Sequence, residues 1–159
     1  MASWPSRRIT TKGTRFLKIS IVTFQKNRNA DIEAAEAEYV KRLSRHATVE
    51  LCPIKKWEDD QGLPARFLKA GRIVGLFVEG RQQTSQELSQ QLQQWMNGGV
   101  SHLVLVIGAA EGMPSGVAGQ IREKWSLSKL TFSHQLIRLL LLEALYRAFD
   151  MLHGGRYHK

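Results

Sequence analysis

The fold is decided by the stretch HLVLVIGAAEG, which occupies residues 102–112. After His102 the first half is wholly apolar, as expected of a strand buried on both faces, and the glycine-bearing loop Gly108–Gly112 follows directly. In open α/β sheets ligands bind beyond the carboxyl ends of the strands, so this loop is a candidate binding site. It has neither the dinucleotide-binding glycine pattern nor the P-loop pattern, so neither ligand is indicated, and a plain turn is the other interpretation.

Strands and helices alternate on both sides of this stretch. We predict further strands at 16–24, 48–54, 72–78 and 127–132, and helices at 31–44, 64–70, 114–124 and 134–152. Another helix opens with the capping-box pattern Thr84–Glu87 and ends near Asn97. Because helices separate the strands and the middle strands are apolar throughout, the pattern predicts an α/β fold, a parallel sheet with helices on both faces.

The composition indicates one folded domain with a polyanionic partner. The chain has 159 residues and a formal net charge of +9, and its isoelectric point is about 10.1. Such a balance favours nucleic acid, although a generally basic surface is the alternative. The one cysteine, Cys52, cannot form an intramolecular disulfide, which fits a reducing compartment. The leucine run 139–142, even when extended through Ala144 and Leu145, is too short to span a membrane.

The first 15 residues are basic and contain no acidic residue. They lack the apolar core of a secretory signal, so two interpretations remain, a transit peptide and an RNA-contacting arm. The remaining residues, 16–159, show no internal repeat and are expected to form a single domain. A cytoplasmic location is expected, or an organellar one if residues 1–15 are a transit remnant.

The last predicted helix and the chain end carry the residues that stand out chemically. Arg138, Glu143 and Arg147 interrupt a run of leucines, and the last two have the spacing of a helical ion pair. This helix either packs in the core or contacts another subunit. The terminal segment 155–159 joins an aromatic ring, an imidazole and two cations, which suits RNA, although a frayed basic tail is equally compatible. His134 opens the helix as a cap, a core residue or a functional group.

Several of these pieces together resemble the RlmH family, a group of small RNA methyltransferases of the knotted α/β (SPOUT) class. The shared segments, in the same order, are Ile107–Gly112, Trp125–Phe132, His134–Arg138, Leu145–Ala148 and Tyr157–Lys159. The family pattern has a second glycine where this chain has Ala109, and a proline where it has Ser133. Spacing matches from about Ile73 to the end of the chain.

The resemblance implies a trefoil knot in the C-terminal half, a homodimer with the last helix at its interface, and S-adenosylmethionine as the cofactor. No metal is implied. The positions that match the family's cofactor contacts are Leu76, Gly108, Leu127, Ser128, Lys129, Leu130, Thr131 and Phe132.

The family's substrate is a pseudouridine in helix 69 of 23S ribosomal RNA, methylated at N3 on the assembled ribosome. Methylation there requires loss of the imide proton, and we expect His158 to assist as base while Tyr157 positions the nucleobase. The resemblance further implies that Glu143 orients Arg147 and that His134 shapes the pocket. Cations expected to hold RNA are Arg138, Arg147, Arg156 and Lys159.

Two other hypotheses remain at this point. The chain could be a non-catalytic RNA-binding or ribosome-binding relative that has lost cofactor binding. It could also be a small basic ribosome-associated protein of unrelated fold, which fits the charge but not the shared segments.

Overall fold

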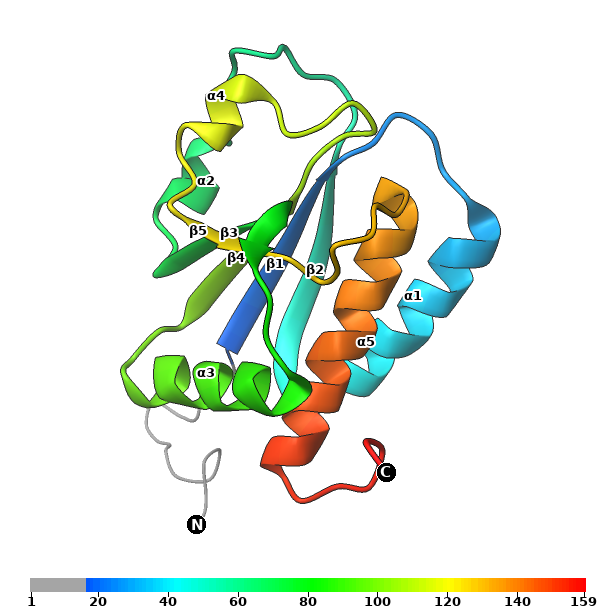
Figure 1. The fold of residues 1–159 in the computed structure, drawn as a ribbon, viewed down its shortest axis with the longest axis vertical. Coiled ribbons are helices and arrows are strands. Elements are labelled where there is room, and N and C mark those ends of the chain that lie inside the picture. Colours follow the sequence, from blue (N-terminus) through cyan, green and yellow to red (C-terminus); the bar gives the residue numbers. More distant parts are fainter. Residues whose placement is uncertain (1–16) are drawn as a thin grey trace.

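Five parallel strands form one sheet with the order β2-β1-β4-β3-β5 (Figure 1). The computed structural model of the protein describes residues 17–159, so the predicted basic arm and Phe16 lie outside the described residues. The elements in chain order are β1 (Leu17–Phe24), α1 (Ala30–Leu43), β2 (Ala47–Ile54), α2 (Ala65–Leu68), β3 (Arg72–Arg81), α3 (Ser85–Asn97), β4 (His102–Ile107), α4 (Ser115–Ala118), β5 (Glu123–Trp125) and α5 (His134–Leu152). The predicted α/β class and parallel sheet are confirmed.

The apolar strand β4 lies in the middle of the sheet. β4 pairs with β1 on one side and β3 on the other, and every residue from Leu103 to Ile107 is buried. The capping box is also confirmed: the Glu87 amide donates to the Thr84 hydroxyl over 3.0 Å, and the Thr84 amide donates to the Glu87 carboxylate over 2.8 Å. Local sequence signals thus set both the central strand and the start of α3.

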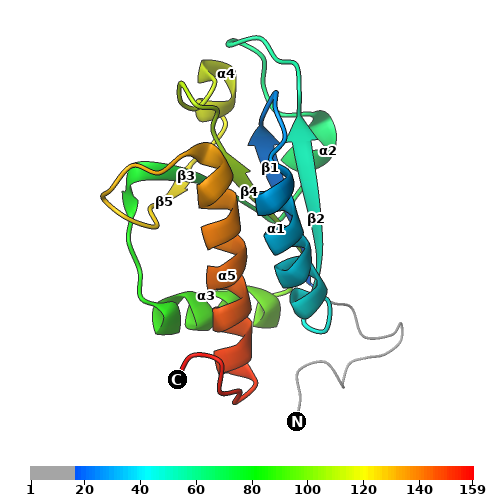
Figure 2. The ribbon, with the colours of Figure 1, turned by 90° about the vertical axis from the view of Figure 1, so that its right-hand side faces the viewer.

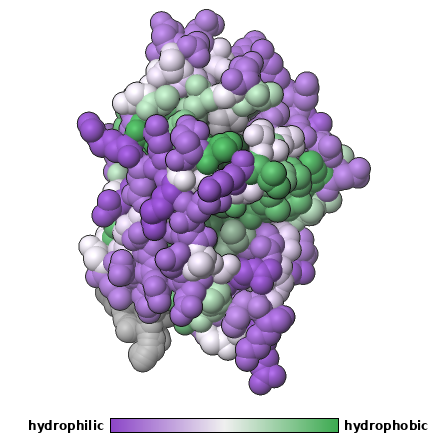
Figure 3. Space-filling model, in the orientation of Figure 1, coloured by the Kyte–Doolittle hydropathy of each residue, from purple (hydrophilic) through white to green (hydrophobic). Residues whose placement is uncertain are grey.

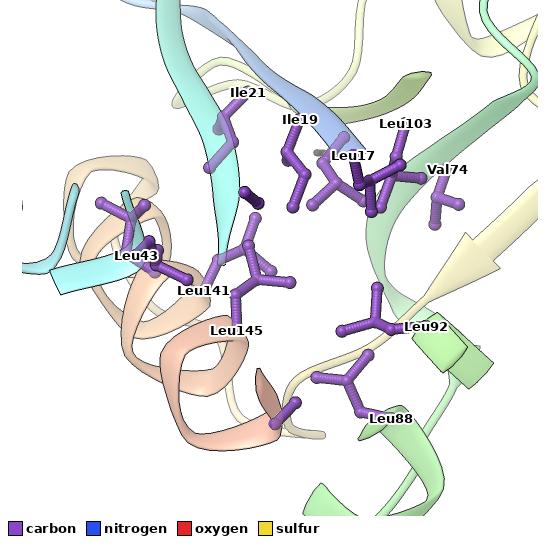
Figure 4. Close-up of a cluster of buried hydrophobic side chains, with 14 of the residues drawn as sticks. Leu17, Ile19, Ile21, Leu43, Val74, Leu88, Leu92, Leu103, Leu141 and Leu145 are labelled. Carbon is purple, nitrogen blue, oxygen red and sulfur yellow. The ribbon is translucent and has the colours of Figure 1, made fainter. Parts of the chain in front are cut away.

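The three long helices, α1, α3 and α5, cover one face of the sheet (Figure 2). Figure 4 shows the core that they share, in which Leu141 and Leu145 of α5 and Leu92 of α3 lie near Ile19 of β1. The short helices α2 and α4 pack a second apolar cluster against the other face, through Phe67 and Val117. Helices on both faces are therefore confirmed.

Two predicted elements are wrong. The predicted helix 114–124 is only the single turn α4, because Gly119 ends it and β5 begins at Glu123. The predicted strand 127–132 is a loop. There the Ser126 hydroxyl donates to the Ser128 carbonyl, and the Ser128 hydroxyl accepts from the Leu130 amide, so local hydrogen bonds replace a sheet ladder.

β3 extends past the predicted end at residue 78, to Arg81. Its pairing with β5 shifts register between Leu76 and Arg81, and Gly80 lies so close to Trp125 that a Cβ atom would stand 2.5 Å from the Trp125 carbonyl carbon. This irregularity leaves the carboxyl end of β3 beside the loop that follows β5. The predicted trefoil knot stays a prediction.

Candidate functional site

A pocket of about 790 Å³ opens at the carboxyl ends of β3 and β4. Its volume is in the range of sites for small organic ligands. The lining comes from separate parts of the chain: 76–79, 107–113, 126–128, 130–134 and Ile137. The glycine-bearing loop is thus part of a pocket and not a plain turn alone.

The loop after β4 forms one wall of this pocket. The Ala109 amide donates to the Gly112 carbonyl and the Gly112 amide donates to the Ala109 carbonyl, each over 2.9 Å, which closes a tight turn. A Cβ atom on Gly108 would stand 2.8 Å from the Met113 amide nitrogen, and Gly112 has a φ of 119°. Both glycines are therefore required by the backbone. Ala109, where the family pattern has glycine, is buried and packs in the second apolar cluster.

The loop after β5 forms the opposite wall. Its serine hydrogen bonds hold the backbone from 126 to 130 in a fixed turn, and Leu130 is 68% exposed although it is a large apolar residue. Every predicted cofactor residue except Lys129 lines the pocket, and the exposed Lys129 does not. The segments that the resemblance implied, which are far apart in sequence, therefore meet at one pocket.

The start of α5 completes the lining with His134 and Ile137. Ser133 caps the helix, since its hydroxyl accepts from the Leu136 amide over 3.3 Å. His134 thus lies where the resemblance expected it. Among residues 17–159, no group of three or more His, Cys, Asp or Glu side chains could hold a metal ion.

The predicted residues of the chain end gather at the other end of α5. The Tyr157 hydroxyl donates to the Glu143 carboxylate over 2.8 Å and lies 3.0 Å from the Tyr39 hydroxyl. Arg147 pairs with the same carboxylate at 2.5 Å and lies over the Tyr157 ring at 4.9 Å. Burial, together with the hydrogen bonds to Tyr39 and Glu143, raises the pKa of Tyr157, so this residue remains a neutral phenol. The expected pairing of Glu143 with Arg147 is present.

Asp150 anchors the rest of the chain end. Its carboxylate accepts from the Tyr157 amide over 2.8 Å and lies 3.9 Å from Nδ1 of His158. Arg156 and Lys159 are exposed. Sequence reasoning missed Asp150 and Tyr39 as partners of the chain end; Tyr39 lies 118 residues away from Tyr157 and was expected only as part of a helix face.

The pocket and the chain end are separated along α5. A helix rises about 1.5 Å per residue, so Arg147 lies about 20 Å from His134. Figures 1 and 2 show the C-terminus at the opposite end of α5 from the loop after β5. Within one chain, therefore, the structure does not bring Tyr157, His158 and Arg147 to the pocket.

Arg138 has a different environment from the one expected. It is 4% exposed, and its guanidinium forms a bidentate salt bridge with the Glu36 carboxylate. It also donates hydrogen bonds to the side-chain oxygens of Gln25 at 2.8 Å and Thr23 at 3.3 Å. The expected contact with RNA phosphate does not fit a guanidinium that is buried and already paired. Its only signal in the sequence was a charge within a leucine run, which fits a buried partner as well as a ligand.

Comparison with known proteins gives a consistent result. The family model described as "Predicted SPOUT methyltransferase" matches residues 17–158. The chain is 31% identical to "Ribosomal RNA large subunit methyltransferase H" of Bacillus pumilus (strain SAFR-032), and 35% identical to the protein of the same name from Bacillus thuringiensis (strain Al Hakam). Each match covers 90% of this chain and 100% of the relative.

A similar fold is found in a probable methylase family protein from Haemophilus influenzae Rd KW20, with a TM-score of 0.55. The two share 10% identity, and the match covers 89% of this chain and 70% of the other. This likeness concerns the fold alone.

Proposed function

Because the chain belongs to the SPOUT methyltransferase family, we propose that it methylates N3 of a pseudouridine in helix 69 of the large-subunit ribosomal RNA, with S-adenosylmethionine as the methyl donor. The relatives' names support an RNA methyltransferase of the large ribosomal subunit. The observation that carries the cofactor assignment is the meeting of the predicted cofactor segments at one pocket.

The pocket has the features that an adenosyl cofactor needs. Backbone groups of the two loops are available for hydrogen bonds, and apolar side chains such as Leu76, Leu127 and Phe132 offer contacts for adenine. Gly108 lets the loop after β4 fold tightly against itself at the pocket wall, since a side chain there would strike Met113. S-adenosylmethionine, when bound, supplies an electrophilic methyl group, and the two loops would hold it.

The chain end supplies groups for the nucleoside. Methylation at N3 requires removal of the imide proton, and His158 would accept it as general base, with Asp150 near its Nδ1. Tyr157, fixed by Glu143 and Tyr39, would stack on or position the nucleobase. Arg147 and the exposed Arg156 and Lys159 would hold phosphates.

We propose that a homodimer unites the two halves of this site. An apolar area lies over the N-terminal half of α5 and the loop after β5 (Figure 3), where Leu130 is 68% and Leu140 is 37% exposed. A two-fold axis that packs α5 against its copy in antiparallel orientation would bring the chain end of one subunit toward the pocket of the other. Light scattering tests this arrangement, because a particle near 18.0 kDa at micromolar concentration contradicts the dimer.

The second candidate function, a non-catalytic ribosome-binding relative, rests on the alanine at position 109. One experiment separates the two. Ribosomes that lack the modification are incubated with the protein and S-adenosylmethionine carrying a labelled methyl group, and the labelled nucleoside is identified. Label in N3-methylpseudouridine supports the enzyme. Absence of label from a folded, dimeric protein that does not bind S-adenosylmethionine supports the binding relative.

The chain end is tested in the same assay. Removal of residues 157–159 is expected to abolish methylation and to leave cofactor binding largely intact. Undiminished turnover by the shortened protein contradicts the roles given to Tyr157 and His158. A cytoplasmic location stays a prediction.

A further inference from the structure

Beside the cofactor pocket, three lysines lie at the carboxyl edge of the sheet. Lys26 follows β1, and Lys55 and Lys56 follow β2; all three are exposed, and we refer to them as the basic ridge. The Gln25 amide donates to the Ile54 carbonyl over 3.0 Å, which ties the two strand ends together. Within residues 17–159, none of the three lysines has a carboxylate within ion-pair distance, whereas Arg28 pairs with Glu33 at 2.7 Å.

The basic ridge also has an aromatic support. The Lys26 ammonium lies 5.4 Å from the ring centre of Trp57, and that ring packs edge-on against Phe24 at 5.5 Å. Lys26 is therefore exposed to solvent but positioned by a cation–π contact with a half-buried tryptophan. Of the acidic residues that follow Trp57, Asp59 is turned toward α4, because it accepts from the Ser115 hydroxyl over 2.6 Å.

A hollow of about 460 Å³ lies directly beside the basic ridge, between α1 and β2. Lys26, Lys55 and Arg28 are among its lining residues, and its floor includes Val40 and Leu51. Its two carboxylates, Glu33 and Glu36, are both paired with arginines. The hollow thus combines an apolar floor with the unpaired cations Lys26 and Lys55, and a positively charged groove of this kind follows the backbone of single-stranded nucleic acid.

The basic ridge lies close to the cofactor pocket. In the sheet order, β1 is the direct neighbour of β4 and β2 is the next strand, so β2 lies about 10 Å from β4 at a spacing of about 4.8 Å per strand. The Gln135 side chain donates to the Asn27 carbonyl over 3.3 Å, which links the segment after β1 to the first turn of α5 beside His134. The basic ridge is therefore within reach of an RNA segment whose methylated nucleotide lies at the cofactor pocket.

We infer that the basic ridge binds phosphates of the ribosomal RNA segment that flanks the methylated nucleotide, and that the adjacent hollow receives a flanking nucleotide. This inference rests on the proposed function for the identity of the RNA. Charge complementarity and the position beside the pocket carry it, and both concern residues outside the cofactor pocket and the chain end.

The test replaces Lys26→Glu and Lys55→Glu together in the full-length protein. Binding to large ribosomal subunits and to a helix 69 RNA fragment is measured at several salt concentrations, and S-adenosylmethionine binding is measured on the same preparations. We expect RNA affinity to fall at least about tenfold and the salt dependence to weaken by about 1.4 in slope, which corresponds to two lost phosphate contacts on single-stranded RNA. Cofactor affinity should stay unchanged.

The matched control is Lys69→Glu with Arg122→Glu. These exposed cations precede β3 and β5, so they lie at the amino edge of the sheet, and their replacement changes the net charge by the same amount. Wild-type RNA affinity and salt slope in the Lys26/Lys55 variant would overturn the inference, and so would an equal loss in the control. A wild-type protein that binds RNA but does not methylate it would instead count against the proposed function. The RNA affinities of the variants would in that case still test whether the basic ridge binds RNA.

Discussion

The assignment of the cofactor pocket is tested most directly by Gly108→Ala. The new Cβ atom would stand 2.8 Å from the Met113 amide nitrogen and 2.9 Å from the Gly112 carbonyl carbon, whereas ordinary contacts begin at 3.4 Å. The deficit is 3.4 − 2.8, about 0.6 Å, and the opposing atoms are backbone, so the pocket wall itself must move. Overpacking of this kind costs about 1–3 kcal/mol. If this cost is present in the cofactor-bound protein and absent from the free protein, in which the loop can shift, the dissociation constant of S-adenosylmethionine rises about 5-fold to 150-fold.

Isothermal titration of the purified protein with S-adenosylmethionine measures this change, and circular dichroism checks that the fold is kept. The matched control is Gly119→Ala at the end of α4, because a Cβ atom there meets only the carbonyl oxygens of Ser115 and Gly116, at 3.7 and 3.8 Å, and the backbone is already helical. We expect the control to bind the cofactor as the wild type does and to be slightly more stable. A folded Gly108→Ala protein whose dissociation constant stays within about twofold of wild type would refute the reasoning.

Further predictions concern the core, the pH dependence of stability and the dimer. Glu36→Gln leaves Arg138 buried beside a neutral partner and should lower the free energy of unfolding by about 3–5 kcal/mol in urea titrations, whereas replacing both residues by leucine should recover most of the loss. A drop below about 1 kcal/mol would show that this pair is not a buried charge pair in solution. Burial and the nearby His153 lower the pKa of His46 to about 4, so the unfolded chain binds the extra proton between about pH 4 and 6.5 and stability falls as the pH falls through this window. His46→Phe should reduce that slope, and an unchanged slope in urea midpoints would contradict this role. At S-adenosylmethionine concentrations too low to load Gly108→Ala, mixed dimers of this variant with a protein lacking 157–159 should regain about a quarter of wild-type methylation, because half of the dimers then hold one complete site. A mixture as inactive as its components would count against a shared site.

Much of the fold was predictable because its signals are local. The apolar strand β4 and the capping box at Thr84 act through neighbouring residues, and both hold in the structure. The predictions of a strand at 127–132 and a helix at 114–124 were wrong because local features outweighed the hydrophobic pattern. Ser126 and Ser128 bond to nearby backbone and so keep an otherwise strand-like stretch out of the sheet, while Gly119 ends α4 after one turn.

Apart from the loop after β4, which its position at the end of a buried strand already indicated, the site was predictable only where a family pattern covered it. The cofactor segments came from the resemblance, and no periodicity in the sequence indicates that Leu76 meets Phe132. The interpretation of Arg138 as an RNA contact failed because its partner, Glu36, lies 102 residues away. A charge in an apolar helix has the same sequence signature whether it is buried with a partner or faces a ligand, so only the three-dimensional pairing separates the two.

The geometry of α5 makes the shared site a stronger expectation than family resemblance alone. Residues of a helix cannot change their separation, so Glu143 and Arg147 stay about 14 and 20 Å from His134 in the same chain. The final residues could extend toward their own pocket only by giving up the bonds of Tyr157 to Glu143, Tyr39 and Asp150. Even then, Glu143 and Arg147 would stay at their positions on α5, away from the pocket of their own chain. If these two residues act on RNA at a cofactor pocket, it is therefore the pocket of the other subunit, and the half-buried leucines at the start of α5 would then be the surface between the two subunits.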